Sequence, residues 1–362
     1  MENELNIRPY RQGDEKRILS LFQSIGNTDC RTLEWWKYRH QGTPGGDAII
    51  WIAEDKEEIV AHLCAVPLIA KQYNKTVKII RGGDAHVMPK YRRTGLFSKL
   101  ILKVLNDCTQ KGISVWLGLP NEKSNPAVLK LGFVAMEKIP KLYKIIKPKR
   151  ISQKIGAEKG IGLGIAVRLL GTLLLFYSQR RKRSIYRNDL IVTKDTAFDD
   201  EYNVFWDQIS KYIGIGVIRD KKYLNWRYNE NPAYKYVIYS IRKKNKIFGF
   251  AVLGCLKEKL NVGRIMEFFV LPEELKSGEM LLEQISSFFT EEDVDMIQYF
   301  DQNPLPHKKI FKKSGYIKIP YTKTQPNTKN NFVIKPLAAD INVKLLTNSK
   351  KWLISWGEIG TV

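Results

Sequence analysis

The segment from Val87 to Phe97 combines the features of a phosphate-binding turn. Gly95 lets the backbone approach a ligand closely, and Arg92 and Arg93 supply positive charge. The apolar spacing after Gly95 predicts a helix, whose first N–H groups have no partner inside the helix. Such a helix start beside two arginines is a site for a pyrophosphate. An ordinary capped helix behind a basic turn is the alternative interpretation, and the turn by itself leaves both open.

The elements that position this turn follow from hydrophobic periodicity. Apolar runs predict strands at 5–9, 48–54, 58–66, 77–88 and 113–119. Helical spacing predicts helices at 14–25, 95–111 and 124–131. The turn therefore joins the long strand to the second helix. Strands in a run, followed by alternating strands and helices, imply an α/β fold of the α+β kind, with a mixed sheet and helices on both faces.

The chain repeats these features in its second half. Five positions recur at a constant offset of 183 residues: Phe22, Val87, Pro89, Gly95 and Gly132 are repeated as Phe205, Val270, Pro272, Gly278 and Gly315. Trp36-Lys37-Tyr38 also recurs, as Trp226-Arg227-Tyr228. Matching strands are expected at 235–241, 247–257, 262–271 and 294–300, with helices at 278–290 and 305–313. We therefore expect a domain at 1–146, a connector at 147–187 and a second domain at 188–362.

The composition fits a globular protein with a strong excess of positive charge. Hydrophobic residues make up 44% of the chain and charged residues 27%, which excludes a disordered or collagen-like chain. Sixty Lys and Arg residues against 37 Asp and Glu residues give a net charge of +23. The four Cys form no CxxC pair and the four His no HxxxH pair, so no metal site is expected. The N-terminal segment lacks the apolar stretch of a signal peptide, and the cytoplasm is the expected location.

The first half resembles a known family at these motifs. The pattern Arg92-x-x-Gly95-x-Phe97 between a strand and an amphipathic helix, followed by a strand, Asn125-Pro126-Ala127 and Gly132-Phe133, looks like the acetyl-CoA-binding core of the GNAT N-acetyltransferase superfamily. Phe97 stands where the family usually has a small residue. The match implies a GNAT fold for this half.

The second half resembles a degraded GNAT domain. Leu275 and Lys276 stand where the first half has its two arginines, and Glu273 and Glu274 precede them. Acidic side chains repel a pyrophosphate, so this half is expected to keep the fold without the cofactor turn.

The resemblance implies how acetyl-CoA, the expected co-substrate, would bind. Backbone N–H groups at the turn would hold the CoA pyrophosphate, and backbone groups at the end of the long strand would pair with the pantetheine arm like an added strand. Asn125 would lie near the pantetheine or the thioester. The expected cofactor-binding residues are Val87, Met88, Arg92, Arg93, Thr94, Gly95, Leu96, Phe97, Ser98 and Asn125. Members of the family usually transfer the acetyl group directly to an amine.

Such a transfer needs a base, because only a neutral amine attacks. Asp84 and His86 lie two positions apart on the long strand, so both side chains point to one face. Glu122, just after the fifth predicted strand, is a third candidate. The alternatives are structural: Asp84 bonds a loop N–H, and His86 is a half-buried residue.

Many family members also carry a Tyr acid, and here that position is Val128. Tyr91, a second-half Tyr such as Tyr299, or water are the remaining candidates for the acid. The aromatic residues of the Trp-x-Tyr segments either line an acceptor pocket or pack in the core or between domains, and packing is the favoured interpretation.

The connector differs in composition from both halves. Residues 138–194 hold fifteen Lys and Arg residues against Glu158 and Asp189, and the stretch 161–177 is apolar. Seventeen residues is the lower limit for a membrane span, and a single span would separate the homologous halves. Leu163, Val167, Leu170 and Leu174 form a stripe at helical spacing. We expect a helical connector that lies peripherally on the anionic inner face of a membrane or packs as an interdomain helix.

Together these patterns favour a tandem N-acetyltransferase that uses acetyl-CoA and no metal and acts on a small-molecule amine. An amino sugar or an envelope or polysaccharide precursor is the candidate acceptor. The alternatives are an aminoacyl-tRNA-dependent peptidyltransferase with two GNAT-like halves and a non-catalytic module that binds CoA or nucleic acid. The net charge suits tRNA, but the intact Arg92-x-x-Gly95 pattern favours CoA, so nucleic acid is not the favoured partner.

Overall fold

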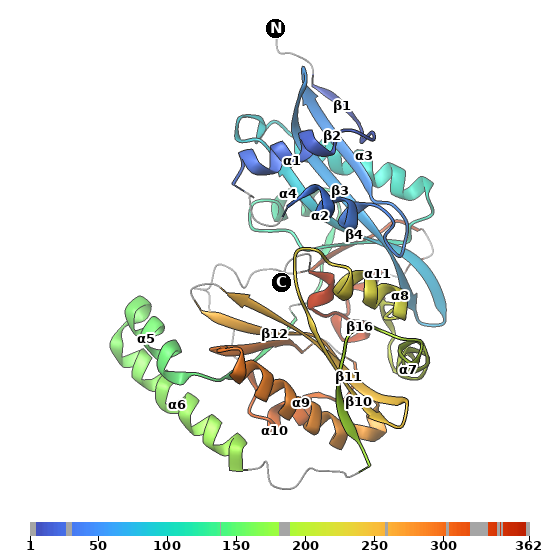
Figure 1. Cartoon of the computed structure of the whole chain (residues 1–362). Helices are drawn as coiled ribbons and strands as arrows, with labels where there is room; N and C mark the ends of the chain where they lie inside the picture. Colours follow the sequence, from blue (N-terminus) through green and yellow to red (C-terminus); the bar gives the residue numbers. More distant parts are fainter. Residues whose placement is uncertain are drawn as a thin grey trace.

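The computed structural model of the chain describes residues 5–26, 31–137, 139–180, 189–257, 260–301, 304–318, 332–338, 341 and 343–359. Each half builds one mixed sheet, and the two halves lie one above the other (Figure 1). The first half contains strands β1 (Asn6–Pro9), β2 (Ile49–Asp55), β3 (Glu58–Gln72), β4 (Lys75–Val87), β5 (Val115–Gly118) and β6 (Val134–Ala135). Its helices are α1 (Glu15–Ser24), α2 (Leu33–His40), α3 (Leu96–Gln110) and α4 (Asn125–Lys130).

The second half repeats this order. Its strands are β8 (Ile191–Asp195), β9 (Ile215–Val217), β10 (Val237–Lys243), β11 (Lys246–Lys257), β12 (Asn261–Val270), β13 (Met296–Phe300), β14 (Ile317–Lys318) and β16 (Trp352–Leu353). Its helices are α7 (Glu201–Ile209), α8 (Lys221–Leu224), α9 (Leu275–Glu291), α10 (Lys308–Lys313) and α11 (Val343–Thr347).

The elements predicted from periodicity are all present, and the α+β mixed-sheet fold is confirmed. The largest difference in the first half is β3, which continues to Gln72 instead of ending at residue 66. Helix α2 was not predicted. Thr32 caps it by accepting a hydrogen bond from the N–H of Trp35. Its buried face combines Trp35 and Trp36 with the polar residues Arg39 and His40, so no apolar stripe marks the helix in the sequence.

The two sheets exchange strands, and the first sheet also receives β9, which pairs with β3, and β16, which pairs with β9. β7 (Lys141–Ile145) leaves the first half and lies in the second sheet between β13 and β14. β15 (Val333–Pro336) comes from the end of the chain and lies in the first sheet between β5 and β6. The strand orders β1-β2-β3-β4-β5-β15-β6 and β8-β10-β11-β12-β13-β7-β14 are then equivalent. The first sheet therefore takes β9, β15 and β16 from the second half, and the second sheet takes β7 from the first half.

The repeated Trp-x-Tyr segments pack the two halves together. The rings of Tyr38 and Trp226 stack with centroids 5.7 Å apart, and Trp226 Nε1 donates to the carbonyl oxygen of Tyr38 at 3.2 Å. Trp36 is fully buried in a core that includes aromatic residues of both halves, such as Phe205. The interpretation of these aromatic residues as packing residues is confirmed.

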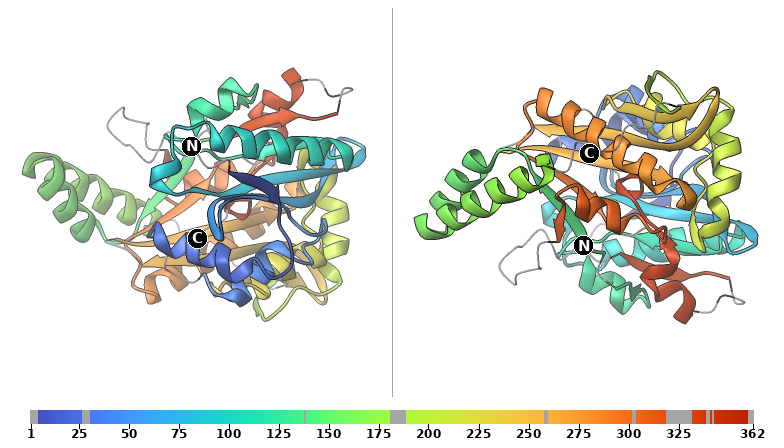
Figure 2. Two further views of the ribbon diagram at one scale, coloured as in Figure 1. Left: turned by 90° about the horizontal axis from the view of Figure 1, so that it is seen from above. Right: turned by 90° about the horizontal axis from the view of Figure 1, so that it is seen from below.

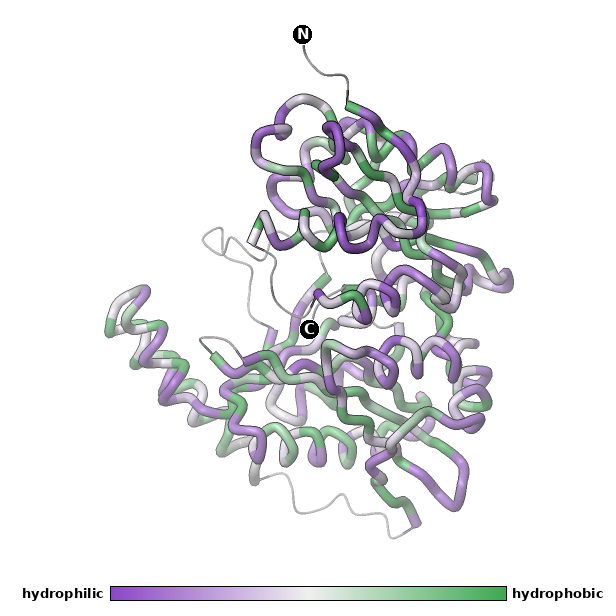
Figure 3. The backbone as a smooth tube through the Cα atoms, turned by 45° about the horizontal axis from the view of Figure 1, so that its top comes forward, coloured by the Kyte–Doolittle hydropathy of each residue, from purple (hydrophilic) through white to green (hydrophobic). Residues whose placement is uncertain are grey.

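The connector forms a helical hairpin that projects from the second half (Figures 1 and 2). Its helices are α5 (Pro148–Lys159) and α6 (Ile161–Arg180). They approach closely at Gly164, where an added Cβ would lie 2.6 Å from the carbonyl oxygen of Ser152. Hydrophilic and hydrophobic stretches are interspersed along the hairpin (Figure 3). Within the described residues, no helix is both long enough and apolar enough for a membrane span.

Candidate active site

Strands β4 and β5 separate at the centre of the first sheet. They pair in parallel from Ile79 and Val115 as far as Arg81 and Leu117. Beyond Arg81, β4 runs on to Val87 without a recorded pair to β5, while its other edge stays paired with β3. This open edge, which we call the fork, presents backbone groups to which an extended ligand can add as a strand.

The turn between β4 and α3 has the geometry of an anion site. Gly95 adopts φ +80°, and no atom lies within 4 Å of the place where a Cβ would be. Arg93 also has a positive φ of 68°. The N–H groups of Leu96, Phe97 and Ser98 form the first turn of a fifteen-residue helix that has no acidic residue there. Partial positive charge from these groups therefore faces open space beside two arginines.

Side chains brace this turn from within. Arg92 Nε donates to the carbonyl oxygen of Val87 at 2.9 Å, and the Thr94 hydroxyl donates to the carbonyl oxygen of Tyr91 at 2.8 Å. The N–H of Met88 donates to the carbonyl oxygen of Val60 on β3, so it points away from the fork. Since backbone groups alternate along a strand, those of Val87 face the fork.

Asp84 lies at a β-bulge of β4, with a left-handed φ of 46°. Its side chain is 11% exposed, and Arg39 Nε donates to its Oδ2 at 3.2 Å. Burial by itself raises the pKa of Asp84, but the Arg39 guanidinium overrides this effect and holds the pKa well below its usual range. Asp84 is therefore an ionised partner of Arg39, which favours a structural role over that of a base.

His40 and Cys64 lie beside the same carboxylate. Ligand atoms of His40, Cys64 and Asp84 lie within 4.8 Å of one another, a spacing that a metal ion could bridge and that the sequence motifs did not predict. Arg39 already compensates the carboxylate charge, and burial raises the pKa of the Cys64 thiol well above its ordinary value. A neutral thiol and a paired carboxylate argue against a bound cation.

His86 lies two positions further along β4, on the face that α1 covers. Its ring packs against Phe22 of α1 with centroids 4.5 Å apart. Arg31 Nη1 lies 3.0 Å from His86 Nε2. Because a guanidinium can only donate, Nε2 is the unprotonated nitrogen. Burial lowers the pKa of His86 to about 4, so the ring is neutral at pH 7.

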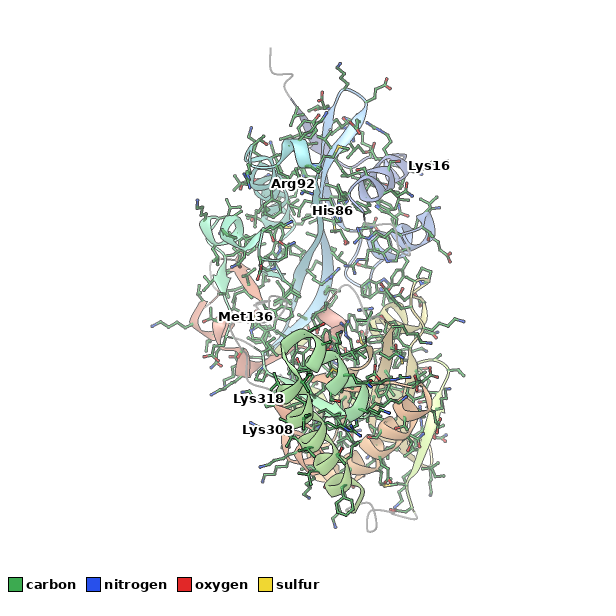
Figure 4. All side chains as sticks on the ribbon, turned by 90° about the vertical axis from the view of Figure 1, so that its left-hand side faces the viewer. Lys16, His86, Arg92, Met136, Lys308 and Lys318 are labelled. Carbon is green, nitrogen blue, oxygen red and sulfur yellow. The ribbon has the colours of Figure 1, made fainter. Side chains whose placement is uncertain are left out.

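Figure 4 shows His86 and Arg92 at the same level of the first half. The other sequence-predicted residues lie elsewhere. Glu122 is exposed in the turn after β5, and Asn125 is half-buried at the start of α4. Tyr299 stacks on Phe311 in the core of the second half, and the Tyr91 hydroxyl donates to Asp55. Val128 is buried, as an apolar core residue should be.

Sequence reasoning missed three arginines, Arg31, Arg39 and Arg81. Arg31 and Arg39 contact the candidate bases, and Arg81 is the last residue of β4 that pairs with β5. The repeat contains the pattern that could have revealed Arg81, because Arg264 stands at the same offset of 183 residues. No short motif marks the other two, which the fold alone brings to β4.

Comparisons with known proteins agree with this geometry. Residues 6–133 match the family model of the acetyltransferase (GNAT) domain. Similar solved structures include a GCN5-related N-acetyltransferase from Anabaena variabilis, with 11% identity, a TM-score of 0.59 and coverage of 92% of this chain and 73% of that chain. Eis1 from Mycobacterium abscessus has 12% identity, a TM-score of 0.54 and coverage of 95% and 76%.

A tandem GNAT protein from the clavulanic acid biosynthesis pathway has 12% identity and a TM-score of 0.54, with coverage of 93% of this chain and all of that chain (100%). At such identities the likeness shows the fold alone. No curated protein matches the chain. Residues 6–133 therefore match a GNAT acetyltransferase domain, and the repeated fold of the chain is similar to that of a tandem GNAT structure.

Proposed function

We propose that the chain transfers an acetyl group from acetyl-CoA to the amine of a small acceptor, once per chain, at the fork of the first half. The observation that carries this proposal is that the open fork along β4 is followed directly by the unobstructed start of α3. An amino sugar or another envelope-precursor amine is the acceptor class that we would test first.

The first half has residues that fit acetyl-CoA. The empty space over Gly95 and the N–H groups of Leu96 to Ser98 would receive the pyrophosphate, with Arg92 and Arg93 beside it. The backbone of Val87 would bind the pantetheine arm at the fork. When bound, the co-substrate supplies an activated acyl group as a thioester.

His86 is the base that the geometry favours. Its Nε2 is unprotonated at pH 7 and lies on the β4 face covered by α1, whereas Asp84 is held by Arg39. In this proposal an acceptor amine takes the place of Arg31 at Nε2, and its proton passes to that nitrogen. Water is the proposed acid for the leaving thiolate, since the hydroxyls of Tyr91 and Tyr299 are engaged or remote.

Calorimetry with acetyl-CoA, followed by an amine screen that detects released CoA thiol, tests the proposal. We expect one acetyl-CoA per chain and turnover with at least one amine class. The tRNA-dependent alternative makes the opposite prediction: binding of tRNA that weakens steeply with salt, and no binding of acetyl-CoA. Stoichiometric tRNA binding without acetyl-CoA binding would overturn the proposal.

We further propose that the α5–α6 hairpin docks the enzyme on an anionic membrane surface. Ile161, Ile165, Leu169 and Leu173 are spaced four residues apart on α6 and are 55% to 77% exposed. They form one outward face, while Gly164 faces α5. Of the stripe predicted from the sequence, Leu163 and Leu170 are exposed and Val167 is half-buried, while the side chain of Leu174 lies outside the described residues.

The charge of the connector selects an anionic bilayer as the occupant of this face. Residues 147–187 contain eleven Lys and Arg residues against Glu158 alone. Each cation near an anionic surface contributes about 1 kcal/mol, and the apolar face would enter the interface as in other monotopic helices. Lys147 and Arg150 are partly neutralised by Asp293, so the remaining cations would carry most of the attraction.

Sedimentation with vesicles of phosphatidylcholine, with and without phosphatidylglycerol, tests docking. Binding should require the anionic lipid, weaken in high salt, and be lost in the double variant Leu169→Glu, Leu173→Glu. The matched control is Leu102→Glu on α3, also an exposed leucine, which should bind normally. Vesicle binding that the double variant retains would refute docking. A dimer that forms without lipid and is lost in the double variant would also refute docking, and it would assign the face to a second copy of the chain.

A further inference from the structure

We propose that Arg81 and Arg39 form a binding site for an anionic group of the acceptor, a carboxylate or a phosphate, at the base of the fork. The proposal rests on the proposed function and names its substrate class. Arg81 is 9% exposed, its Nη2 has no hydrogen-bond partner, and it forms no ion pair with any described residue. A buried cation without a counter-ion is costly, so its retention points to a ligand that supplies the missing charge.

The space next to Arg81 is shared with a second guanidinium. A Cβ placed on Gly83 would lie 3.6 Å from Arg81 Nη2 and 3.8 Å from Arg39 Nη2. Both groups therefore converge on a position that Gly83 keeps free of side chain. Arg39 is balanced by Asp84, while the charge of Arg81 is not balanced among the described residues. Two converging guanidiniums with one carboxylate leave a net positive charge that suits a carboxylate or phosphate.

Neighbouring Gly82 serves a different purpose. A Cβ there would lie 2.2 Å from Trp116 Nε1, so this glycine is required for packing on the α3 side of the sheet. Gly83, by contrast, tolerates a methyl group at ordinary contact distances. Gly82 is thus required for packing, whereas Gly83 is proposed to leave space for a ligand. A substitution at Gly82 should therefore affect folding, and one at Gly83 should affect binding.

The second half provides an internal comparison. Arg264 pairs with Gln298 at the end of the β12–β13 ladder, as Arg81 pairs with Leu117. The Arg264 guanidinium lies over the ring of Trp356 at 4.2 Å, so the C-terminal segment covers it. In the half with the cofactor turn, no described aromatic ring covers the equivalent arginine. The same position is therefore filled by protein in one half and left for a ligand in the other.

The site lies where it can select an acceptor. Arg81, whose Nη2 lies beside Gly83 as Arg39 Nη2 of α2 does, lies on the same face of β4 as His86, which packs against Phe22 of α1. An acceptor that approaches this face would place its anionic group at Arg81 and its amine toward His86.

Matched acceptor pairs test the inference: an amino acid against its amide for the carboxylate, and glucosamine against glucosamine 6-phosphate for the phosphate. The anionic member of one pair should be preferred about 10- to 100-fold in kcat/KM, the range expected for charged hydrogen bonds. Arg81→Met should abolish this preference with unchanged acetyl-CoA affinity and no loss in Tm, because it removes an unpaired buried charge. Arg81→Lys should restore part of the preference, and Gly83→Ala should raise the acceptor KM.

A second measurement does not depend on turnover. Inorganic phosphate is titrated by calorimetry into the Gly95→Glu variant, whose cofactor turn is blocked, with and without Arg81→Met. Phosphate binding that requires Arg81 supports the site, and equal binding in both variants overturns it. If acetyl-CoA binds but neutral and anionic amines react equally, the anion site is wrong and the proposed function stands. If acetyl-CoA does not bind at all, the proposed function itself fails.

Discussion

The two halves share a strand order but differ at the turn that follows the central strand. In the first half, four residues separate the short 3-10 turn Pro89–Tyr91 from α3, and Gly95 holds the left-handed conformation that opens the helix start. In the second half, α9 begins directly after Pro272–Glu274, and the equivalent Gly278 is buried inside the helix. The helix has grown into the space where an anion would bind.

Side chains reinforce this difference. The first turn of α9 is preceded by Glu273 and Glu274, and Ser277 donates to the Glu274 carboxylate at 3.1 Å. The helix start is therefore flanked by negative charge, which disfavours a bound anion. A Cβ on Gly278 would lie 2.6 Å from Ile310 Cδ1, so this glycine now serves helix packing. Gly95 and Gly278 occupy equivalent positions in the repeat, but the residues around each one give it a different role.

The forks differ in the same way. Glu267 stands at the offset of Asp84, and it is fully enclosed by Arg219, Tyr228 and Ser355. Gly357 approaches so closely that a Cβ would lie 2.6 Å from Glu267 Oε1. The C-terminal segment thus fills the second fork with a buried polar network. The fork of the second half is therefore occupied by protein, while the fork of the first half is the one proposed to bind a ligand.

The largest expected effect is loss of CoA binding in the Gly95→Glu variant. The substitution places a carboxylate at the anion site and a side chain at φ +80°, so affinity should fall by at least about 100-fold. Lys276→Glu at the second turn is the matched control and should leave calorimetric stoichiometry at one. Two CoA molecules per chain, or normal binding by Gly95→Glu, would contradict the assignment of the turn.

Next in size is the effect of His86→Ala on turnover. Loss of the base should lower kcat by roughly 10²- to 10⁴-fold while acetyl-CoA affinity is kept. Asp84→Asn should instead reduce the free energy of unfolding by about 3–5 kcal/mol, because Arg39 loses its partner. Measuring turnover and urea unfolding for both variants distinguishes the proposed base from the structural residue. Full stability with lost turnover in Asp84→Asn would reverse the two assignments.

Removing Trp356 tests whether the second fork is structural. Trp356→Ala empties a buried site over Arg264, so the free energy of unfolding should fall by about 3–5 kcal/mol. CoA stoichiometry should remain one, since the acidic turn of the second half is unchanged. Gain of a second CoA site would mean that the C-terminal segment, and not the turn, blocks binding.

A pH dependence of stability common to both halves is also expected, and it is gradual because it builds up over several pH units. Burial lowers the pKa of His62 to about 3 and that of His307 to about 4. Unfolded histidine binds protons below about pH 6.5, whereas these residues stay neutral in the folded state. Stability should therefore fall as pH decreases from about 6.5 toward 4, by up to about 1.4 kcal/mol per histidine per pH unit.

Because the sheets exchange β7 and β15, urea unfolding at pH 7.5 and at pH 5 should each give one cooperative transition. Glu358→Gln, which weakens only the network of the second half, should shift that single transition rather than split it. Two separate transitions would show that the halves fold independently despite the exchange.

Much of the fold could be predicted because it depends on local pattern. Periodicity located the predicted strands and helices to within a few residues at most ends, and the offset between Gly95 and Gly278 revealed the repeat. The turn at Arg92–Gly95 was found because left-handed glycine, basic residues and a helix start are adjacent in sequence. Helix α2 was not predicted because its buried face carries the polar residues Arg39 and His40, which leave no apolar stripe in the sequence.

What the sequence determined by itself was therefore most of the elements, the duplication and the glycine turn before α3, all of which depend on neighbours along the chain. The tertiary structure alone decided which side chains meet. The ion pair of Arg39 with Asp84 joins positions 45 residues apart, and the exchange of β7 and β15 joins opposite halves. Trp356 of the C-terminal segment packs on Arg264, whereas no described aromatic ring packs on Arg81. Burial and pairing of charges depend on such distant contacts, and no local pattern encodes them.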